Sequence, residues 1–150
     1  SIDDEVNMVE IILDICNTIG LDDVEIHVAH PELFESLDSD QIQALKDGDL
    51  SIFDSLPIVG DASWVSKSSY LQSFISSLEK KHISNVLVSP FLYKDVSYYN
   101  GLFFDVVSKS FGKVIGSGGR YDRVLNSFDL HSNAFGFALR MHYLEEALNG

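Results

Sequence analysis

Apolar residues follow two different spacings along this chain. Between residues 69 and 80 they recur every three or four positions, which predicts an amphipathic helix. From 24 to 28 they alternate with polar residues, which predicts a strand with one buried face. By the same criteria and the usual helix start and stop signals, we expect helices at 3–19, 31–37, 40–47, 120–128 and 141–148, and strands at 86–88, 98–107, 113–115 and 134–139.

The segment at 38–66 has the least regular pattern. Ser39 is expected to cap a helix there, because its hydroxyl can accept a hydrogen bond from the first helical turn. A further helical turn is expected around 52–56, and the glycine and polar residues at 60–63 predict a loop. We therefore interpret this segment as a helical insertion within a single domain that covers residues 1–150.

Glycines gather at Gly116-Ser117-Gly118-Gly119, between the strand expected at 113–115 and the helix expected at 120–128. A glycine turn before a helix start can aim backbone N–H groups at an anion such as a carboxylate. A bare connection between strand and helix is the alternative. The run lacks the Lys-Ser/Thr pair of a P-loop, and Tyr121 stands where a dinucleotide fingerprint needs glycine. A mononucleotide site is therefore not predicted.

Composition and charge limit the classes of partner that the chain can bind. With 150 residues, of which 45% are hydrophobic, the chain can bury a globular core. Its net charge is −13, and a nucleic-acid surface needs clustered Lys and Arg. The same acidic balance disfavours an anionic membrane surface. We therefore expect neither a nucleic acid nor a membrane as a partner.

Cysteine and histidine add no site of their own. The single cysteine, Cys16, excludes an internal disulfide and lies among apolar residues, so we expect it to be buried. His27 and His30 lie close together in sequence, but no third metal ligand follows them, so no metal site is predicted. No apolar run reaches about 18 residues and no signal-peptide pattern opens the chain, so the cytoplasm is the expected location.

Three motifs resemble the histidyl-tRNA synthetase family. YYNGLFFDVV (98–107) and GSGGRYDRVL (116–125) are similar to the family's two histidine-specific motifs, usually written RGLDYYTG…F and AGGRYDGL. NAFGFALRMHYLEEAL (133–148) resembles class II motif 3, GFA-x-G-x-ER-L. The resemblance covers nearly the whole chain and is weakest at 39–82. It implies an α+β fold like that of class II aminoacyl-tRNA synthetases, with a mostly antiparallel sheet flanked by helices. Nothing corresponds to motifs 1 and 2, so we expect the C-terminal half of such a domain.

The resemblance also implies a site for L-histidine. Tyr99 matches the second tyrosine of the YY pair and Tyr121 the tyrosine of GGRYD, and both line the imidazole pocket in the family. Arg120 would pair with a carboxylate or brace the loop. Tyr98 points to the opposite face of its strand from Tyr99, where core packing is expected. The candidate ligand residues are Tyr98, Tyr99, Gly118, Gly119, Arg120 and Tyr121.

Departures from the family motifs argue against aminoacylation. Lys94-Asp95-Val96-Ser97 stands where the family has Arg-Gly-Leu-Asp, so the arginine that helps to activate histidine is replaced. Tyr143 stands at the position of the motif 3 arginine that clamps ATP, and Arg140 is displaced by three residues. Lysine supplies no planar fork and tyrosine no charge. We therefore expect no catalytic residue and no cofactor.

A retained histidine pocket with lost ATP chemistry resembles the regulatory subunit of ATP phosphoribosyltransferase, a synthetase paralogue in histidine biosynthesis. This resemblance implies a non-catalytic subunit that binds the catalytic subunit of ATP phosphoribosyltransferase, senses L-histidine and forms a homodimer within a hetero-oligomer. The chain stops at Gly150, directly after the motif 3 segment, as expected for a subunit without an anticodon-binding domain. Two alternatives stay open: a divergent histidyl-tRNA synthetase catalytic fragment, and a synthetase-like tRNA-sensing module.

Overall fold

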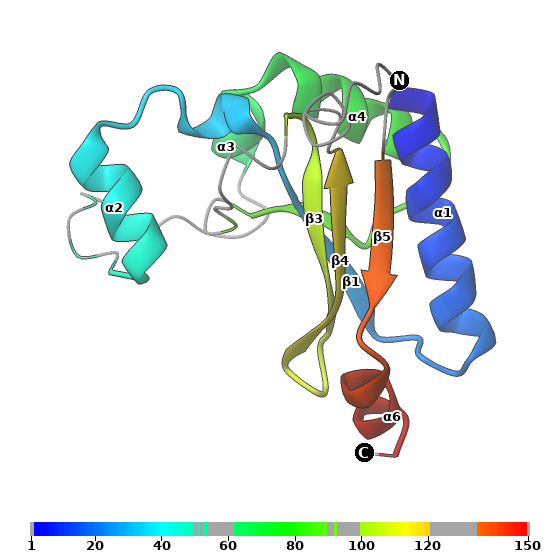
Figure 1. Cartoon of the computed structure of the whole chain (residues 1–150). Coiled ribbons are helices and arrows are strands. Elements are labelled where there is room, and N and C mark those ends of the chain that lie inside the picture. Colours follow the sequence, from blue (N-terminus) through cyan, green and yellow to red (C-terminus); the bar gives the residue numbers. More distant parts are fainter. Residues whose placement is uncertain are drawn as a thin grey trace, which may run out of the picture.

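The computed structural model describes residues 2–49, 51, 53, 62–89, 92, 100–120 and 135–149. Its elements are α1 (Ile2–Thr18), β1 (Val24–Ala29), the 3₁₀ helix η1 (Pro31–Phe34), α2 (Ser39–Asp47), α3 (Ala62–Val65), α4 (Ser69–Lys80), β2 (Val86–Val88), β3 (Phe103–Ser108), β4 (Lys113–Arg120), β5 (Phe135–Leu139) and α6 (Met141–Asn149). The sheet stands between α1 on one side and α2 on the other, and α4 lies near its upper end (Figure 1).

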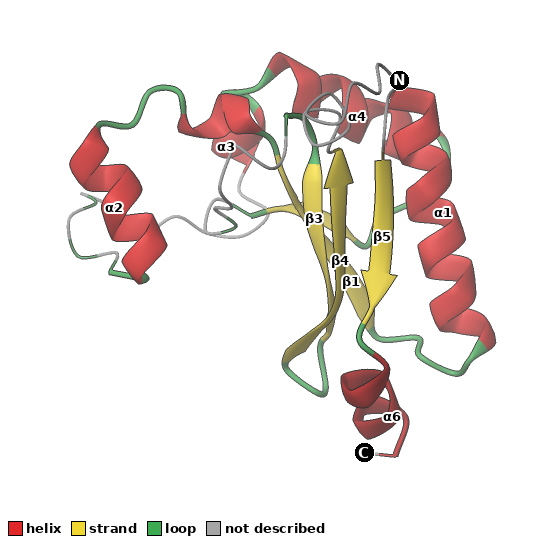
Figure 2. Ribbon diagram, in the orientation of Figure 1, coloured by secondary structure: helices red, strands yellow, loops and turns green. Residues whose placement is uncertain are grey.

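One sheet of five strands organises the described residues, in the order β2-β1-β3-β4-β5. β1 pairs with β2 in parallel, and every other neighbouring pair is antiparallel. Figure 2 shows the strands in yellow with the helices outside them. The expected α+β architecture with a mostly antiparallel sheet is therefore confirmed.

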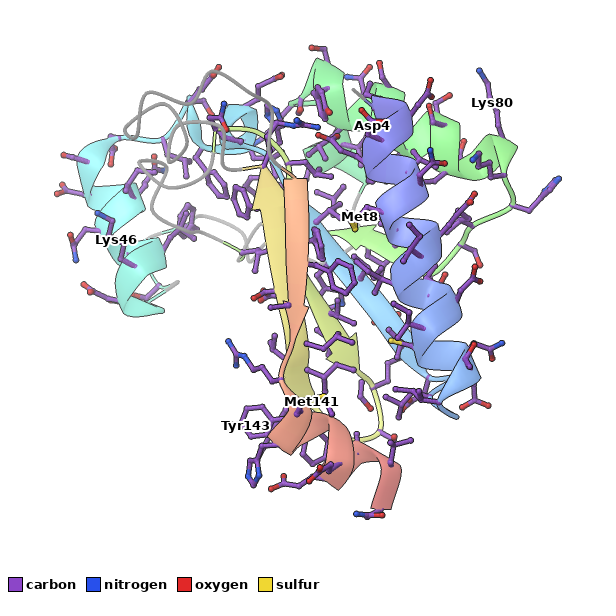
Figure 3. All side chains as sticks on the ribbon, turned by 45° about the vertical axis from the view of Figure 1, so that its right-hand side comes forward. Asp4, Met8, Lys46, Lys80, Met141 and Tyr143 are labelled. Carbon is purple, nitrogen blue, oxygen red and sulfur yellow. The ribbon has the colours of Figure 1, made fainter. Side chains whose placement is uncertain are left out.

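The core lies between the sheet and the helices α1 and α4. Val24, Ile26 and Val28 of β1 are at most 3% exposed, as their alternation with Glu25 and His27 predicts. Side chains fill the space between α1 and the sheet (Figure 3). The helices contribute Val6, Val9, Ile12, Cys16, Leu71, Phe74 and Leu78 to this core. Each square ångström of apolar surface buried there contributes about 25 cal/mol, which holds both helices against this face of the sheet.

Several of the expected helices, strands and caps differ from the observed ones. α4 and β2 have the expected bounds, but β3 begins at Phe103 and not at 98. Asp38, not Ser39, caps α2, because its carboxylate accepts from the Gln41 N–H at 2.8 Å while the Gln41 side chain bonds back to the Asp38 N–H. The loop expected at 60–63 is wrong in its second half, since Ala62 opens α3. The turn expected around 52–56 lies outside the described residues except for one position.

The glycine run is part of β4 and not a turn, so the predicted anion-binding turn before a helix is wrong. β4 continues through Arg120, which also rules out a helix start at that residue. A Cβ on Gly118 would lie 2.6 Å from Phe104 Cζ and 2.9 Å from Phe137 Cα, and nearer still to the carbonyl oxygen of Gly136. Glycine in a strand marks such a close approach of two backbones. Gly118 therefore allows β4 to pack tightly beside β5.

None of the described helices combines the length and the apolar composition that crossing a membrane requires.

Gly118→Ala should destabilise the protein by about 3 kcal/mol, because the added methyl group meets neighbouring backbone that cannot move aside without breaking the strand pair. Urea unfolding followed by circular dichroism measures the change. Ser117→Ala is the matched control, since this neighbouring side chain is only partly buried, and its effect should stay within about 0.5 kcal/mol. Equal stability of the two variants would contradict the close approach.

Candidate functional site

Half of the candidate ligand residues lie in the described part of the chain. Gly118, Gly119 and Arg120 are the last three residues of β4. The three tyrosines at 98, 99 and 121 lie outside the described residues. Gly119 is buried and pairs with Phe103 on one side and Gly136 on the other. The described part of the site is therefore the end of a strand that has a neighbouring strand on each side.

The end of β4 joins the two segments that carry the candidate tyrosines. The Arg120 N–H donates to the Leu102 carbonyl oxygen at 2.8 Å, and the Asn100 N–H donates to the Arg120 carbonyl oxygen at 3.1 Å. Asn100 directly follows Tyr99, and Arg120 directly precedes Tyr121. The backbone of Arg120 thus joins the residue that follows Tyr99 to the residue that precedes Tyr121.

Arg120 forms a buried ion pair with Glu5 of α1. Its Nε and Nη2 atoms each donate to Glu5 Oε1 at 2.9 Å. The Glu5 side chain is 0% exposed and that of Arg120 is 13% exposed. The Tyr70 hydroxyl of α4 donates to Glu5 Oε2. One carboxylate therefore connects α1, α4 and β4.

Burial explains why Glu5 has charged and polar partners. A carboxylate removed from water needs hydrogen bonds and a counter-charge to offset its lost hydration. Desolvation raises the pKa of Tyr70, and the neighbouring Glu5 carboxylate raises it further, so the phenol keeps its proton and remains a donor. Glu5 was not among the residues that the sequence predicted for the site. The missed signal is its position four residues before Val9, on the same buried stripe of α1.

His30 covers the other side of Tyr70. The two rings stack with their centroids 4.6 Å apart. The imidazole Nδ1 accepts from the Glu32 backbone N–H at 3.2 Å and so caps η1. Burial lowers the pKa of His30, and the nearby Glu32 carboxylate opposes that shift in part. His30 is therefore held as a neutral ring within the packing of the site.

The face of the sheet opposite the core carries a polar row. His27 on β1 lies opposite Asp105 on β3, which lies opposite Ser117 on β4. The His27 ring lies 3.3 Å from a Glu25 carboxylate oxygen. Within the described ranges, no three His, Cys, Asp or Glu side chains are arranged to hold a metal ion. The row thus places an imidazole, a carboxylate and a hydroxyl group side by side across three strands.

Tyr143, at the position of the motif 3 arginine, packs against the hairpin between β3 and β4. Its ring centroid lies 6.2 Å from that of Phe111, and Lys113 Nζ lies 5.0 Å from the Tyr143 centroid. Figure 3 places Tyr143 at the lower end of the molecule, on α6. Arg120 ends β4 at the opposite end of that strand (Figure 1). The tyrosine therefore serves packing, with a cation over its ring.

Glu5→Gln should lower the free energy of unfolding by about 3 kcal/mol, because it removes the buried negative charge that pairs with the largely buried Arg120 guanidinium. Glu5→Met combined with Arg120→Met should cost less than the sum of the two single changes, since no unpaired charge remains. Chemical denaturation measures the free energy of unfolding of Glu5→Gln, of the two single methionine variants and of the double variant, each against the wild type. Glu10→Gln is the control on the same helix, because its exposed pair with Lys81 contributes less than about 1 kcal/mol. Additive costs of the two methionine substitutions would argue against the buried pair.

His30→Asn should flatten the pH dependence of stability. The folded state disfavours protonated His30, so wild-type stability is complete above the ordinary histidine pKa of 6.5 and falls as the pH drops below it toward the lowered folded value. Asparagine keeps a helix-capping side chain but does not titrate. Unfolding at a series of pH values from 7.5 to about 5 measures the slope. The exposed His142 provides the control His142→Asn, which should retain the wild-type slope; an unchanged slope in His30→Asn would exclude His30 as its source.

A family model described as histidyl-tRNA synthetase matches residues 47–144. Among curated relatives, the ATP phosphoribosyltransferase regulatory subunit of Bacillus subtilis is 45% identical over 65 residues, which are 43% of this chain and 17% of that protein. The protein of the same name from Lysinibacillus sphaericus is 35% identical over 82 residues, which are 54% of this chain and 21% of that protein. The aligned segments thus span about a fifth of these relatives or less, and the predicted similarity to such regulatory subunits is confirmed.

Solved structures share the fold. An ATP phosphoribosyltransferase regulatory subunit/histidyl-tRNA synthetase from Bacillus halodurans superposes with a TM-score of 0.81 at 20% identity, over 100% of this chain and 50% of that one. The histidyl-tRNA synthetase from Nostoc sp. PCC 7120 gives a TM-score of 0.73 at 14% identity, over 99% of this chain and 47% of that one. Since the family model covers more than half of the residues, the chain belongs to the histidyl-tRNA synthetase family.

Proposed function

We propose that this chain is part of a regulatory subunit of ATP phosphoribosyltransferase that binds the catalytic subunit and senses L-histidine. The observation that carries the proposal is the 35–50% identity with several proteins named as such regulatory subunits. In this role the protein would work in the cytoplasm, as a homodimer within a hetero-oligomer. It would itself catalyse no step of the transferase reaction.

Two departures from the synthetase motifs support a regulatory rather than a synthetase role. Lys94 and Tyr143 replace two arginines that the synthetase motifs use. Tyr143 contacts Phe111 and lies under the Lys113 ammonium group, and a phenol offers no charge to bind a phosphate group. A protein that keeps the pocket without these arginines would bind histidine and leave it unchanged.

Histidine recognition would rest on Tyr99 and Tyr121. A neutral imidazole has one donor and one acceptor, and phenol hydroxyl groups can serve either. The flat aromatic rings supply apolar walls for the imidazole ring. Arg120 supports this assignment because its backbone bonds tie the residue before Tyr121 to the residue after Tyr99. The polar row of His27, Asp105 and Ser117 lies on the face of the same strands that is opposite to α1, and its side chains are partly buried.

Feedback would follow from linkage. Histidine changes the activity of an assembly only if it binds the active and the inhibited states with different affinities. The regulatory subunit would supply that difference, and the catalytic subunit would report it. An effect of typical size is a five- to 150-fold change in affinity, or roughly 1–3 kcal/mol of coupling.

Calorimetric titration with L-histidine tests the proposal, using the protein alone and in complex with a phosphoribosyltransferase catalytic subunit. Tyr121→Phe should weaken histidine binding at least about tenfold, because a buried polar group of the ligand loses its partner. Tyr143→Phe makes the same chemical change at a residue that serves packing, and it should leave the affinity for histidine within about twofold of the wild type.

ATP provides the decisive comparison. The proposal expects histidine to bind and ATP to give no binding heat with the protein alone. Binding of ATP with histidyl-adenylate formation would overturn it in favour of a divergent histidyl-tRNA synthetase. Failure of histidine to bind in both the free protein and the complex would overturn the sensing role.

A further inference from the structure

We propose that Glu5 and Tyr70 are positioning residues of the histidine site, which act by fixing Arg120 between the two tyrosine-bearing segments. This inference rests on the proposed function, since it assigns residues outside the family motifs to that same site. Both residues come from helices, one from α1 and one from α4. They would bind no ligand themselves and would set the geometry in which the ligand is bound.

Arg120 is the link between these helices and the site. Its backbone N–H and carbonyl bond to Leu102 and Asn100, so it fixes where the chain leaves Tyr99 and where it enters Tyr121. A Cβ on Gly101 would lie 3.1 Å from Arg120 Cδ and 3.3 Å from Arg120 Cβ. The aliphatic part of the arginine therefore lies directly over Gly101, two residues before β3, and a larger residue there would push against it.

Glu5 determines the direction of the arginine side chain. Two guanidinium nitrogens, Nε and Nη2, donate to the same carboxylate oxygen at 2.9 Å. Contact through two adjacent nitrogens fixes the plane of the guanidinium group as well as its distance. Because Glu5 is fully buried within a packed helix, a shift of Arg120 would break charge-assisted hydrogen bonds without water to replace them.

Tyr70 determines the orientation of the carboxylate. Its hydroxyl occupies Glu5 Oε2, while the arginine occupies Oε1. A carboxylate with different donors on its two oxygens cannot rotate freely about its last bond. The Tyr70 ring is in turn stacked on His30, the cap of η1. The arrangement has the order expected of a supporting shell, in which one fixed group holds the next.

Tyr70→Phe is the variant that tests this role, because it removes one hydroxyl and keeps the ring stacked on His30. Calorimetry at 20 °C should show a weakening of L-histidine binding of about threefold to tenfold, with the far-ultraviolet circular dichroism spectrum unchanged. Tyr143→Phe is the matched control, since it removes a hydroxyl at the other end of β4, and its affinity should equal that of the wild type. Glu5→Gln should weaken binding more than Tyr70→Phe.

A double-mutant cycle on histidine affinity separates positioning from general destabilisation. Arg120→Lys keeps the positive charge but loses the two-nitrogen contact. If Tyr70 acts through Arg120, adding Tyr70→Phe to Arg120→Lys should change the dissociation constant by less than twofold. Independent, multiplying effects would overturn the inference, as would wild-type affinity in Tyr70→Phe. Absence of binding in the wild-type protein would instead overturn the proposed function on which the inference rests.

Discussion

A carboxylate that loses all contact with water has to be neutralised by its neighbours, and Glu5 imposes this constraint on the described fold. Its two oxygens accept hydrogen bonds from Arg120 and Tyr70, so α1, α4 and β4 can assume only positions that keep these bonds. Apolar burial would tolerate small shifts between helix and sheet, because hydrophobic contacts have no direction. The ion pair and the phenol supply direction, and they do so at the strand end that precedes Tyr121.

The same sheet separates two kinds of chemistry. One face is covered by α1 and α4 and carries Val24, Ile26 and Val28. The other carries the row of His27, Asp105 and Ser117, whose side chains are only partly buried. Strand alternation alone produces this division. Residues on the polar face can thus be substituted without disturbing the packing on the covered face.

Much of this architecture could be predicted from the sequence, for identifiable reasons. α4 and β2 were predicted with their observed bounds because the apolar period is regular and polar residues flank both elements. The run from Gly116 to Gly119 was misassigned because glycine has no side chain to show which face of a strand it occupies. Its role depends on β5, and a single stretch of sequence does not show which neighbour a strand will have. Periodicity can identify a glutamate on an apolar stripe, but not the arginine 115 residues away with which it pairs.

That separation of 115 residues between Glu5 and Arg120 has a consequence for how the chain is made. Synthesis proceeds from the N-terminus, so α1 emerges long before the strand that neutralises its glutamate. Contacts between distant residues also require the closing of a large loop and form slowly. Until β4 is complete, Glu5 lacks its arginine, and the first helix has to keep this one carboxylate in contact with water.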